Sequence, residues 1–102
     1  MKIEIIVNSS YHHYELMLDT GMDFFEFNNK LVQFDTNIFK NRLFDIISTW
    51  QENIWIDGAI DTESYKIKIT DKQHNHVFMG NASLPHNYND LIKLLEEVSC
   101  YE

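Results

Sequence analysis

The sequence is poor in the residue types that make linkers and covalent crosslinks. Its 102 residues include three glycines, one proline and one cysteine. So few glycines and prolines argue against long flexible linkers. Cys100 has no second cysteine with which to form a disulfide bond within the chain, and this cysteine usage is typical of a reducing compartment. We therefore expect a cytoplasmic protein.

Long apolar runs are missing too. No run approaches the roughly 18 residues that a membrane-spanning helix needs. Near the N-terminus, Glu4 interrupts the apolar residues and no small-residue cleavage site follows. We therefore expect neither a membrane span nor a signal peptide.

Positive charge is scarce. Eight Lys and Arg residues stand against sixteen Asp and Glu residues, so the formal net charge is -8 and the sequence pI is about 4.9. Such a chain repels phosphate backbones and anionic lipids, and we expect no nucleic-acid or membrane partner. An acidic surface suits a protein partner with a basic surface. It can also serve solubility alone.

Apolar and aromatic residues are plentiful. Hydrophobic residues make up 44% of the chain and aromatic residues 14%, which is too much for a disordered chain. The length suits one domain with one core. The sequence therefore predicts a single globular domain over residues 1–102.

The first third of the chain has the two-residue periodicity of β-strands. Residues 2–8 are β-branched and residues 14–19 alternate between apolar and polar, so we predict two antiparallel strands. Two short apolar pieces follow, at 23–27 and 31–34. The Asn-Asn-Lys stretch at 28–30 between them predicts a tight hairpin, because Asn tolerates positive φ.

The pattern then changes to that of a helix. The cluster Asp-Thr-Asn at 35–37 is typical of a helix N-terminus. Ile38 and Phe44 flank the apolar stripe, so we expect a wide buried arc. The stripe recurs at helical spacing and consists of Phe39, Leu43, Ile46, Ile47 and Trp50.

The last third predicts a hairpin and a second helix. Residues 64–70 alternate cleanly, 71–75 form a polar hairpin loop, and 76–79 are the return strand. Asn87 is a suitable N-cap for a helix with a carboxylate, Asp90, in its first turn. The apolar face of this helix consists of Leu91, Leu94, Leu95 and Val98. These elements predict an α+β fold, in which an antiparallel β-sheet (a meander plus a hairpin) carries two helices packed on one face.

No catalytic motif is present. The chain has no GxSxG, no P-loop, no GxGxxG and no CxxC. We therefore expect no enzyme and no cofactor. The alternative is a small metal-binding protein or enzyme that uses His74 and His76. These histidines are two residues apart and would share one face of a strand, although no third His or Cys lies at a metal-site spacing.

One segment combines acidic residues with tryptophan. Between Arg42 and Lys66 the chain holds five acids and no base. If residues 54–56 are extended with both isoleucines inward, Trp55 points outward among carboxylates and can anchor an interface. Trp55 can equally pack beneath the loop as a core residue. The predicted partner-binding residues are Glu52, Trp55, Asp57, Asp61 and Glu63.

These observations predict a small acidic protein–protein interaction module. It would act as an inhibitor or immunity-type protein that masks a basic partner. The alternative is a homo-oligomeric structural protein, for example a homodimer, that pairs with itself through an edge strand or the Trp55 surface.

The C-terminal two-thirds also carries a pattern of its own. A helix ending I-I-x-x-W at residues 46–50 precedes a hairpin, and a G-x-x-x-x-P-x-N-Y passage at 80–88 leads into the last helix. This resembles a group of small uncharacterised bacterial proteins. The resemblance implies a fold unit and no activity. Each matching residue has a structural reason to be there, such as the fixed φ of Pro85 and the capping chemistry of Asn87.

Overall fold

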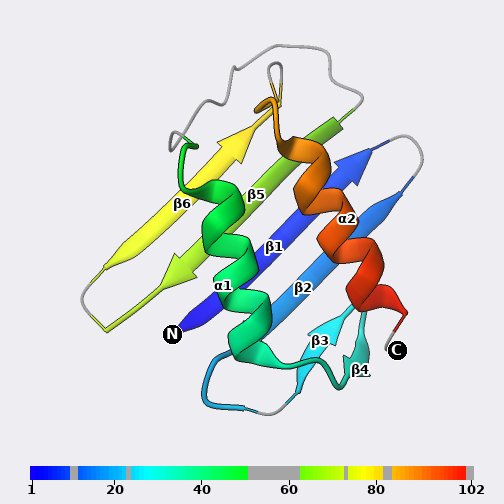
Figure 1. Ribbon diagram of the computed structural model, residues 1–102, viewed down its shortest axis with the longest axis vertical. Coiled ribbons are helices and arrows are strands. Elements are labelled where there is room, and N and C mark those ends of the chain that lie inside the picture. The colour runs from blue at the N-terminus through cyan, green and yellow to red at the C-terminus, as the bar shows by residue number, and fades with distance from the viewer. Residues whose placement is uncertain (10–11, 23, 51–62, 73, 82–83, 101–102) are drawn as a thin grey trace.

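The protein is a six-stranded antiparallel sheet with two helices. The computed structural model describes residues 1–9, 12–22, 24–50, 63–72, 74–81 and 84–100 (Figure 1). The sheet order is β4-β3-β2-β1-β5-β6. The elements are β1 (Lys2–Ser9), β2 (His13–Asp19), β3 (Phe25–Phe27), β4 (Lys30–Val32), α1 (Thr36–Ile47), β5 (Glu63–Thr70), β6 (Asn75–Gly80) and α2 (Tyr88–Ser99). The predicted α+β fold is confirmed.

The centre of the sheet is β1, which pairs with β2 on one side and with β5 on the other. Ile5, for example, lies between Leu16 of β2 and Ile67 of β5. All three side chains are buried, because side chains alternate along each strand and these fall on the same face. The β-branched residues of β1 and the alternating residues of β2 and β5 thus form the middle of the sheet.

The β3–β4 hairpin turns on two asparagines. Asn28 and Asn29 have φ values of 50° and 66°. Successive positive φ angles match the twist that a two-residue hairpin turn requires. Asn28 also accepts a hydrogen bond through Oδ1 from the backbone N–H of Glu15 at 2.8 Å, which ties the turn to β2. The predicted hairpin is confirmed, with strands shorter than the apolar pieces suggested.

Helix α1 begins where its capping residue predicts. The side chain of Asp35 accepts hydrogen bonds from the backbone N–H groups of Asn37 and Ile38, at 2.9 and 3.0 Å. Ile38 itself is 51% exposed, so the prediction of a wide buried arc was wrong on that side. Ile38 lies about 100° around the helix from Phe39, and α1 packs against the sheet through one face only.

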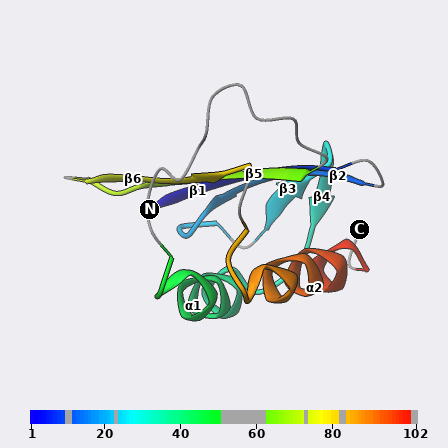
Figure 2. The same cartoon turned by 90° about the horizontal axis from the view of Figure 1, so that it is seen from above.

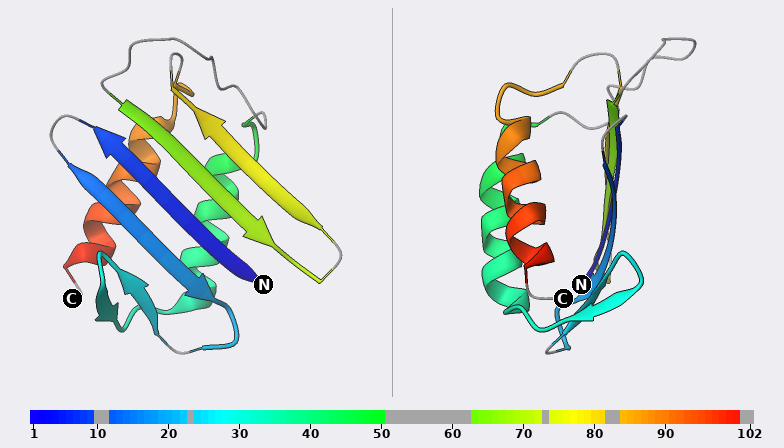
Figure 3. Two further views of the ribbon diagram at one scale, coloured as in Figure 1. Left: turned by 180° about the vertical axis from the view of Figure 1, so that it is seen from behind. Right: turned by 90° about the vertical axis from the view of Figure 1, so that its right-hand side faces the viewer.

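Both helices cover the same face of the sheet (Figures 2 and 3). Between the helices and the sheet lies one core of buried side chains, which includes the whole predicted apolar face of α2. An ion pair between Arg42 Nη1 and Glu97 Oε2, at 2.6 Å, joins the two helices near the surface. Neither helix is long and apolar enough to cross a membrane, as far as the described residues go.

We predict that Gly80 cannot be replaced by alanine without loss of stability. Gly80 pairs with Tyr65, and a Cβ at Gly80 would lie 2.6 Å from Tyr65 Cε1 and 2.8 Å from its hydroxyl oxygen. Tyr65 is 1% exposed and has no space to move away. Gly80→Ala should therefore lower the free energy of unfolding by about 1–3 kcal/mol, measured by urea denaturation.

Gly21→Ala is the matched control. The nearest atom to a Cβ at Gly21 is Asp19 Oδ1 at 3.5 Å, an ordinary contact. This variant should change stability by less than about 1 kcal/mol. Equal effects at the two glycines would contradict the steric account.

Candidate functional site

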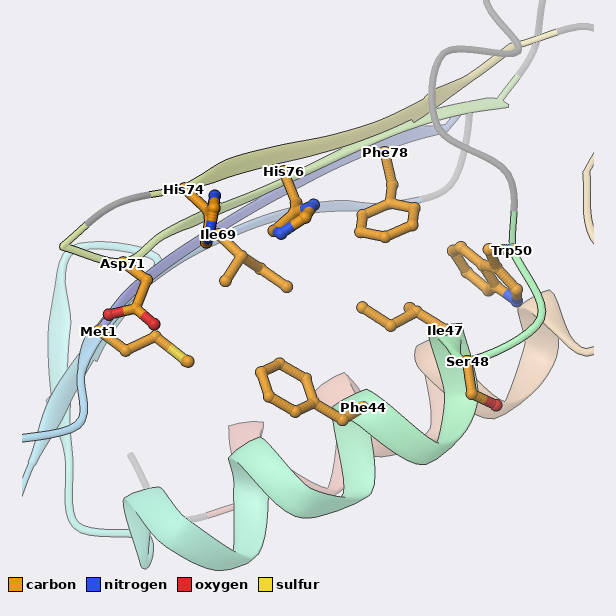
Figure 4. A pocket seen from close by; sticks show the side chains of 10 residues that line it. All are labelled: Met1, Phe44, Ile47, Ser48, Trp50, Ile69, Asp71, His74, His76 and Phe78. Carbon is orange, nitrogen blue, oxygen red and sulfur yellow. The ribbon is translucent and has the colours of Figure 1, made fainter.

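A cleft of about 390 Å³ opens between α1 and the β5–β6 hairpin (Figure 4). We call it the α1–β6 cleft. Its lining residues are Met1, Phe44, Ile47, Ser48, Trp50, Ile69, Asp71, His74, His76 and Phe78. The volume falls at the lower end of the range for ligand-binding sites.

The strand side of the cleft follows from the pleat of β6. His76 pairs with Ile69, and Phe78 pairs with Ile67 on β5. Residues opposite each other in a sheet share a face, so both side chains point toward the helices. Figure 4 shows His74, just before the strand, on the same side as His76 and Phe78. The prediction placed both histidines in one strand, but β6 begins at Asn75, so His74 lies just outside it although on the same side of the sheet.

The helix side of the cleft is supplied by α1. Phe44 and Ile47 are three residues apart and project from neighbouring turns toward β6 (Figure 4). Phe44 is only partly buried, since the cleft leaves its ring open on one side. The sequence pattern placed Phe44 at an edge of the core, and in the fold it forms part of the α1 wall of the cleft.

Three of the polar side chains that line the cleft lie together at one end. Asp71, His74 and His76 lie there, and the two imidazole rings are 6.2 Å apart between centroids. Asp71 Oδ1 accepts a hydrogen bond from the backbone N–H of Lys72 at 2.7 Å. Among the described residues, no group of three His, Cys, Asp or Glu side chains is placed to hold a metal ion. The arrangement therefore suits an apolar ligand group with one polar contact at its end.

Trp50 closes the other end of the cleft and is fixed by Asn87. The indole Nε1 donates a hydrogen bond to Asn87 Oδ1 at 2.6 Å. Asn87 Nδ2 donates in turn to the backbone carbonyl of Ile46 at 2.8 Å. One amide side chain thus joins the C-terminal end of α1 to the start of α2.

The role predicted for Asn87 was wrong in part. Asn87 does occupy the N-cap position of α2, with Asp90 in the first turn, but its side chain makes no capping hydrogen bond. Both of its polar atoms are engaged by Trp50 and Ile46 instead. An amide carries both a donor and an acceptor, and here a buried indole and an open helix carbonyl need one of each.

Trp50 rests on two tyrosines. Its ring centroid lies 5.1 Å from that of Tyr65 and 6.4 Å from that of Tyr88, and the two tyrosine rings are 5.6 Å apart. All three are buried. Aromatic contacts of this kind stabilise a fold beyond the area they bury. The wall of the cleft at Trp50 is accordingly rigid.

Glu63, the only predicted partner-binding residue that lies in the described ranges, starts β5. Its Oε1 accepts a hydrogen bond from the Tyr88 hydroxyl at 3.3 Å and lies 3.5 Å from His12 Nε2. Its side chain is 28% exposed. Glu63 therefore contacts the aromatic cluster of Trp50, Tyr65 and Tyr88, and part of its carboxylate is still open to solvent.

The other predicted partner-binding residues are Glu52, Trp55, Asp57 and Asp61. They fall within 51–62, outside the described residues. Their place in the chain is still informative. The described chain stops at Trp50, which lines the α1–β6 cleft, and resumes at Glu63, which contacts Tyr88. The two described residues that flank the acidic segment, Trp50 and Glu63, thus both contact the same group of aromatic side chains.

Comparisons of the chain with protein families, with curated proteins and with solved structures found no match. The resemblance to a group of small bacterial proteins therefore stays a prediction. Any functional conclusion rests on the residues of the chain itself.

We predict that Asn87→Ala destabilises the protein. The substitution leaves the Trp50 N–H and the Ile46 carbonyl without their partner, and each is at least partly removed from water. Unsatisfied groups of this kind cost about 1–3 kcal/mol. Urea denaturation measures the loss. Asn89→Ala, at an exposed position two residues along, is the control and should leave stability within about 0.5 kcal/mol.

We also predict that the fold weakens in alkali through Tyr88. Burial raises the pKa of Tyr88, and the charge and hydrogen bond of Glu63 raise it further. The unfolded chain then loses this proton first, near the ordinary tyrosine pKa of about 10. The contribution of Tyr88 to the free energy of unfolding is therefore complete below about pH 10 and is lost as the pH rises through and above that value.

Urea denaturation of the native protein and of Tyr88→Phe, between pH 8 and pH 11, measures this effect. The native protein should lose more stability across that interval than the variant does. Parallel curves would show that Tyr88 does not contribute to the pH dependence.

Proposed function

We propose that the protein is a binding module that captures a protein partner with a basic surface, as an inhibitor or immunity-type protein does. The proposal is carried by the acidic composition of residues 51–62 and by the contacts of the two residues that flank them, Trp50 and Glu63. The segment 51–62 holds Glu52, Asp57 and Asp61 and no basic residue. It is joined at one end to Trp50 of the α1–β6 cleft and at the other to Glu63.

The distribution of charge supports a local role for this segment. All eight basic residues lie outside it, and some are already paired with acids, as Lys2 is with Glu4 at 3.4 Å and Arg42 with Glu97. A local excess of carboxylates attracts a basic surface over a distance and speeds the encounter. A neighbouring apolar cleft supplies the desolvated contacts that most of the affinity of an interface comes from.

The rigidity of the two flanking residues also supports binding. Trp50 is held by Asn87 and by two tyrosine rings, and Glu63 is held by Tyr88. A segment with fixed ends loses less conformational freedom when it binds than one with free ends does. The proposal places the protein in the cytoplasm, where its exposed free thiol, Cys100, stays reduced.

The test is capture of partners from an extract of the protein's own cells. The tagged native protein is compared with Asp57→Lys/Asp61→Lys, and bound proteins are identified by mass spectrometry. The native protein should retain a basic partner that this variant loses, while the melting temperatures of the two stay close.

A charge-matched control separates a local effect from a global one. Asp45→Lys/Glu26→Lys changes two exposed acids elsewhere, and each double variant adds four charge units to the formal charge of -8. The control should still capture the partner. Equal loss in both variants, or unchanged capture by Asp57→Lys/Asp61→Lys, would contradict the proposal.

A further inference from the structure

We propose that the α1–β6 cleft binds an extended segment of the partner, which pairs with β6 as an additional strand and inserts alternate side chains into the cleft. The inference rests on the proposed function in one respect: the partner is a basic protein. It uses none of the residues of the segment 51–62.

The two edges of the sheet differ in how well they are protected. β4, at one edge, has three residues and includes Lys30, and short or charged edge strands resist further pairing. β6, at the other edge, has six residues and contains no charged residue and no proline. Its register with β5 runs without a bulge from Tyr65↔Gly80 to Thr70↔Asn75. β6 thus has the regularity that strand addition requires.

The cleft lies beside that edge. Figure 2 shows that α1 is the helix nearer to β6 and that β6 reaches beyond it. Phe78 and Phe44 lie on opposite walls of the cleft, with Phe78 across from Ile47 (Figure 4). A strand paired to β6 would direct every second side chain to this same face, next to Phe78. Main-chain hydrogen bonds would then supply affinity, and the cleft would select the side chains.

The lining defines the chemistry of the segment. Phe44, Ile47 and Phe78 suit apolar side chains of Val or Leu size at alternate positions. Asp71 is the one side chain among the lining residues with a formal charge at neutral pH, and it suits a Lys or Arg at one end of the segment. A basic, alternating segment fits both features.

Charge also argues against a second copy of the chain as the occupant. Two copies would each carry a formal net charge of -8 over the whole chain. Like charges at an interface disfavour association, most strongly at low salt. A basic partner would instead be attracted to this acidic chain.

The first experiment uses the native protein and a fluorescein-labelled synthetic peptide, Lys-Thr-Val-Thr-Leu-Thr-Val-Thr-Lys, with binding followed by fluorescence anisotropy. Two further peptides each carry two N-methyl groups, one at its two valines and the other at the two threonines that lie between the apolar residues. Alternate N–H groups of an added strand point toward its neighbour. One methylated peptide should therefore bind about tenfold more weakly than the unmodified peptide, and the other within about threefold of it.

Equal binding of the two methylated peptides would show an apolar contact without strand pairing and would overturn the proposal. Absence of binding by the unmodified peptide would also overturn it.

The second experiment places the peptide in the cleft. Phe44→Ala should weaken binding of the unmodified peptide about tenfold, because it removes an aromatic wall of the cleft. Ile38→Ala, an exposed apolar position on the same helix, should leave binding unchanged. Equal binding by both variants would overturn the proposal. If Phe44→Ala does not fold, the methylated peptides still decide the question on the native protein.

Light scattering across a dilution series tests the alternative occupant. The protein should be monomeric at every concentration. A dimer that the peptide dissociates would assign the edge to a second copy and overturn the proposal.

The peptide experiments do not involve Asp57 or Asp61, so their failure leaves the proposed function standing. Likewise, unchanged capture by Asp57→Lys/Asp61→Lys would leave strand pairing standing.

Discussion

Two hydrogen bonds made by one side chain, Asn87, connect the two helices across 37 and 41 residues of sequence. They join the end of α1, the indole of Trp50 and the start of α2. Trp50 is thereby pressed against Tyr65 and Tyr88, and it forms the end wall of the α1–β6 cleft. These bonds are directional and fix the end of α1 relative to the start of α2, whereas the apolar contacts of both helices with the sheet are non-directional. The geometry of the cleft therefore depends on a polar contact outside it.

The two edges of the sheet, β4 and β6, differ in length and in charge. At the β4 edge, a three-residue strand with a lysine ends the sheet. At the β6 edge, an uncharged and regular strand meets an apolar cleft whose aromatic walls come from the helix layer. Sheets whose edges remain regular favour the addition of a strand, and proteins otherwise block them. The combination of a regular edge, a cleft and a negative net charge suits recognition of a basic, extended segment.

Much of the fold could be predicted from local pattern. The alternation of β1, β2 and β5, the Asn28–Asn29 turn and the Asp35 cap are each determined by neighbours in sequence, and the structure has all of them. The cleft could not be predicted in this way. It exists because β5 returns to pair with β1 and leaves β6 at the edge, near α1. That order depends on contacts between distant segments. Phe44 and His76 show no local sign of it beyond the two-residue spacing of His74, His76 and Phe78.

Asn87 shows a different limit. Its position in sequence correctly indicated the start of a helix, but the partner of its side chain lies 37 residues away. Capping chemistry and bridging chemistry use the same amide atoms, so the residue type could not distinguish between them. Of the predicted partner-binding residues, Glu63 alone lies in the described ranges, and its contacts with Tyr88 and His12 are again long-range.

Amide hydrogen exchange along β6, with and without the unmodified peptide, tests the central claim most directly. Strand pairing predicts that exchange slows at alternate β6 amides and stays unchanged in β4, because only outward-pointing N–H groups gain a partner. Peptide binding that leaves exchange in β6 unchanged would contradict the account.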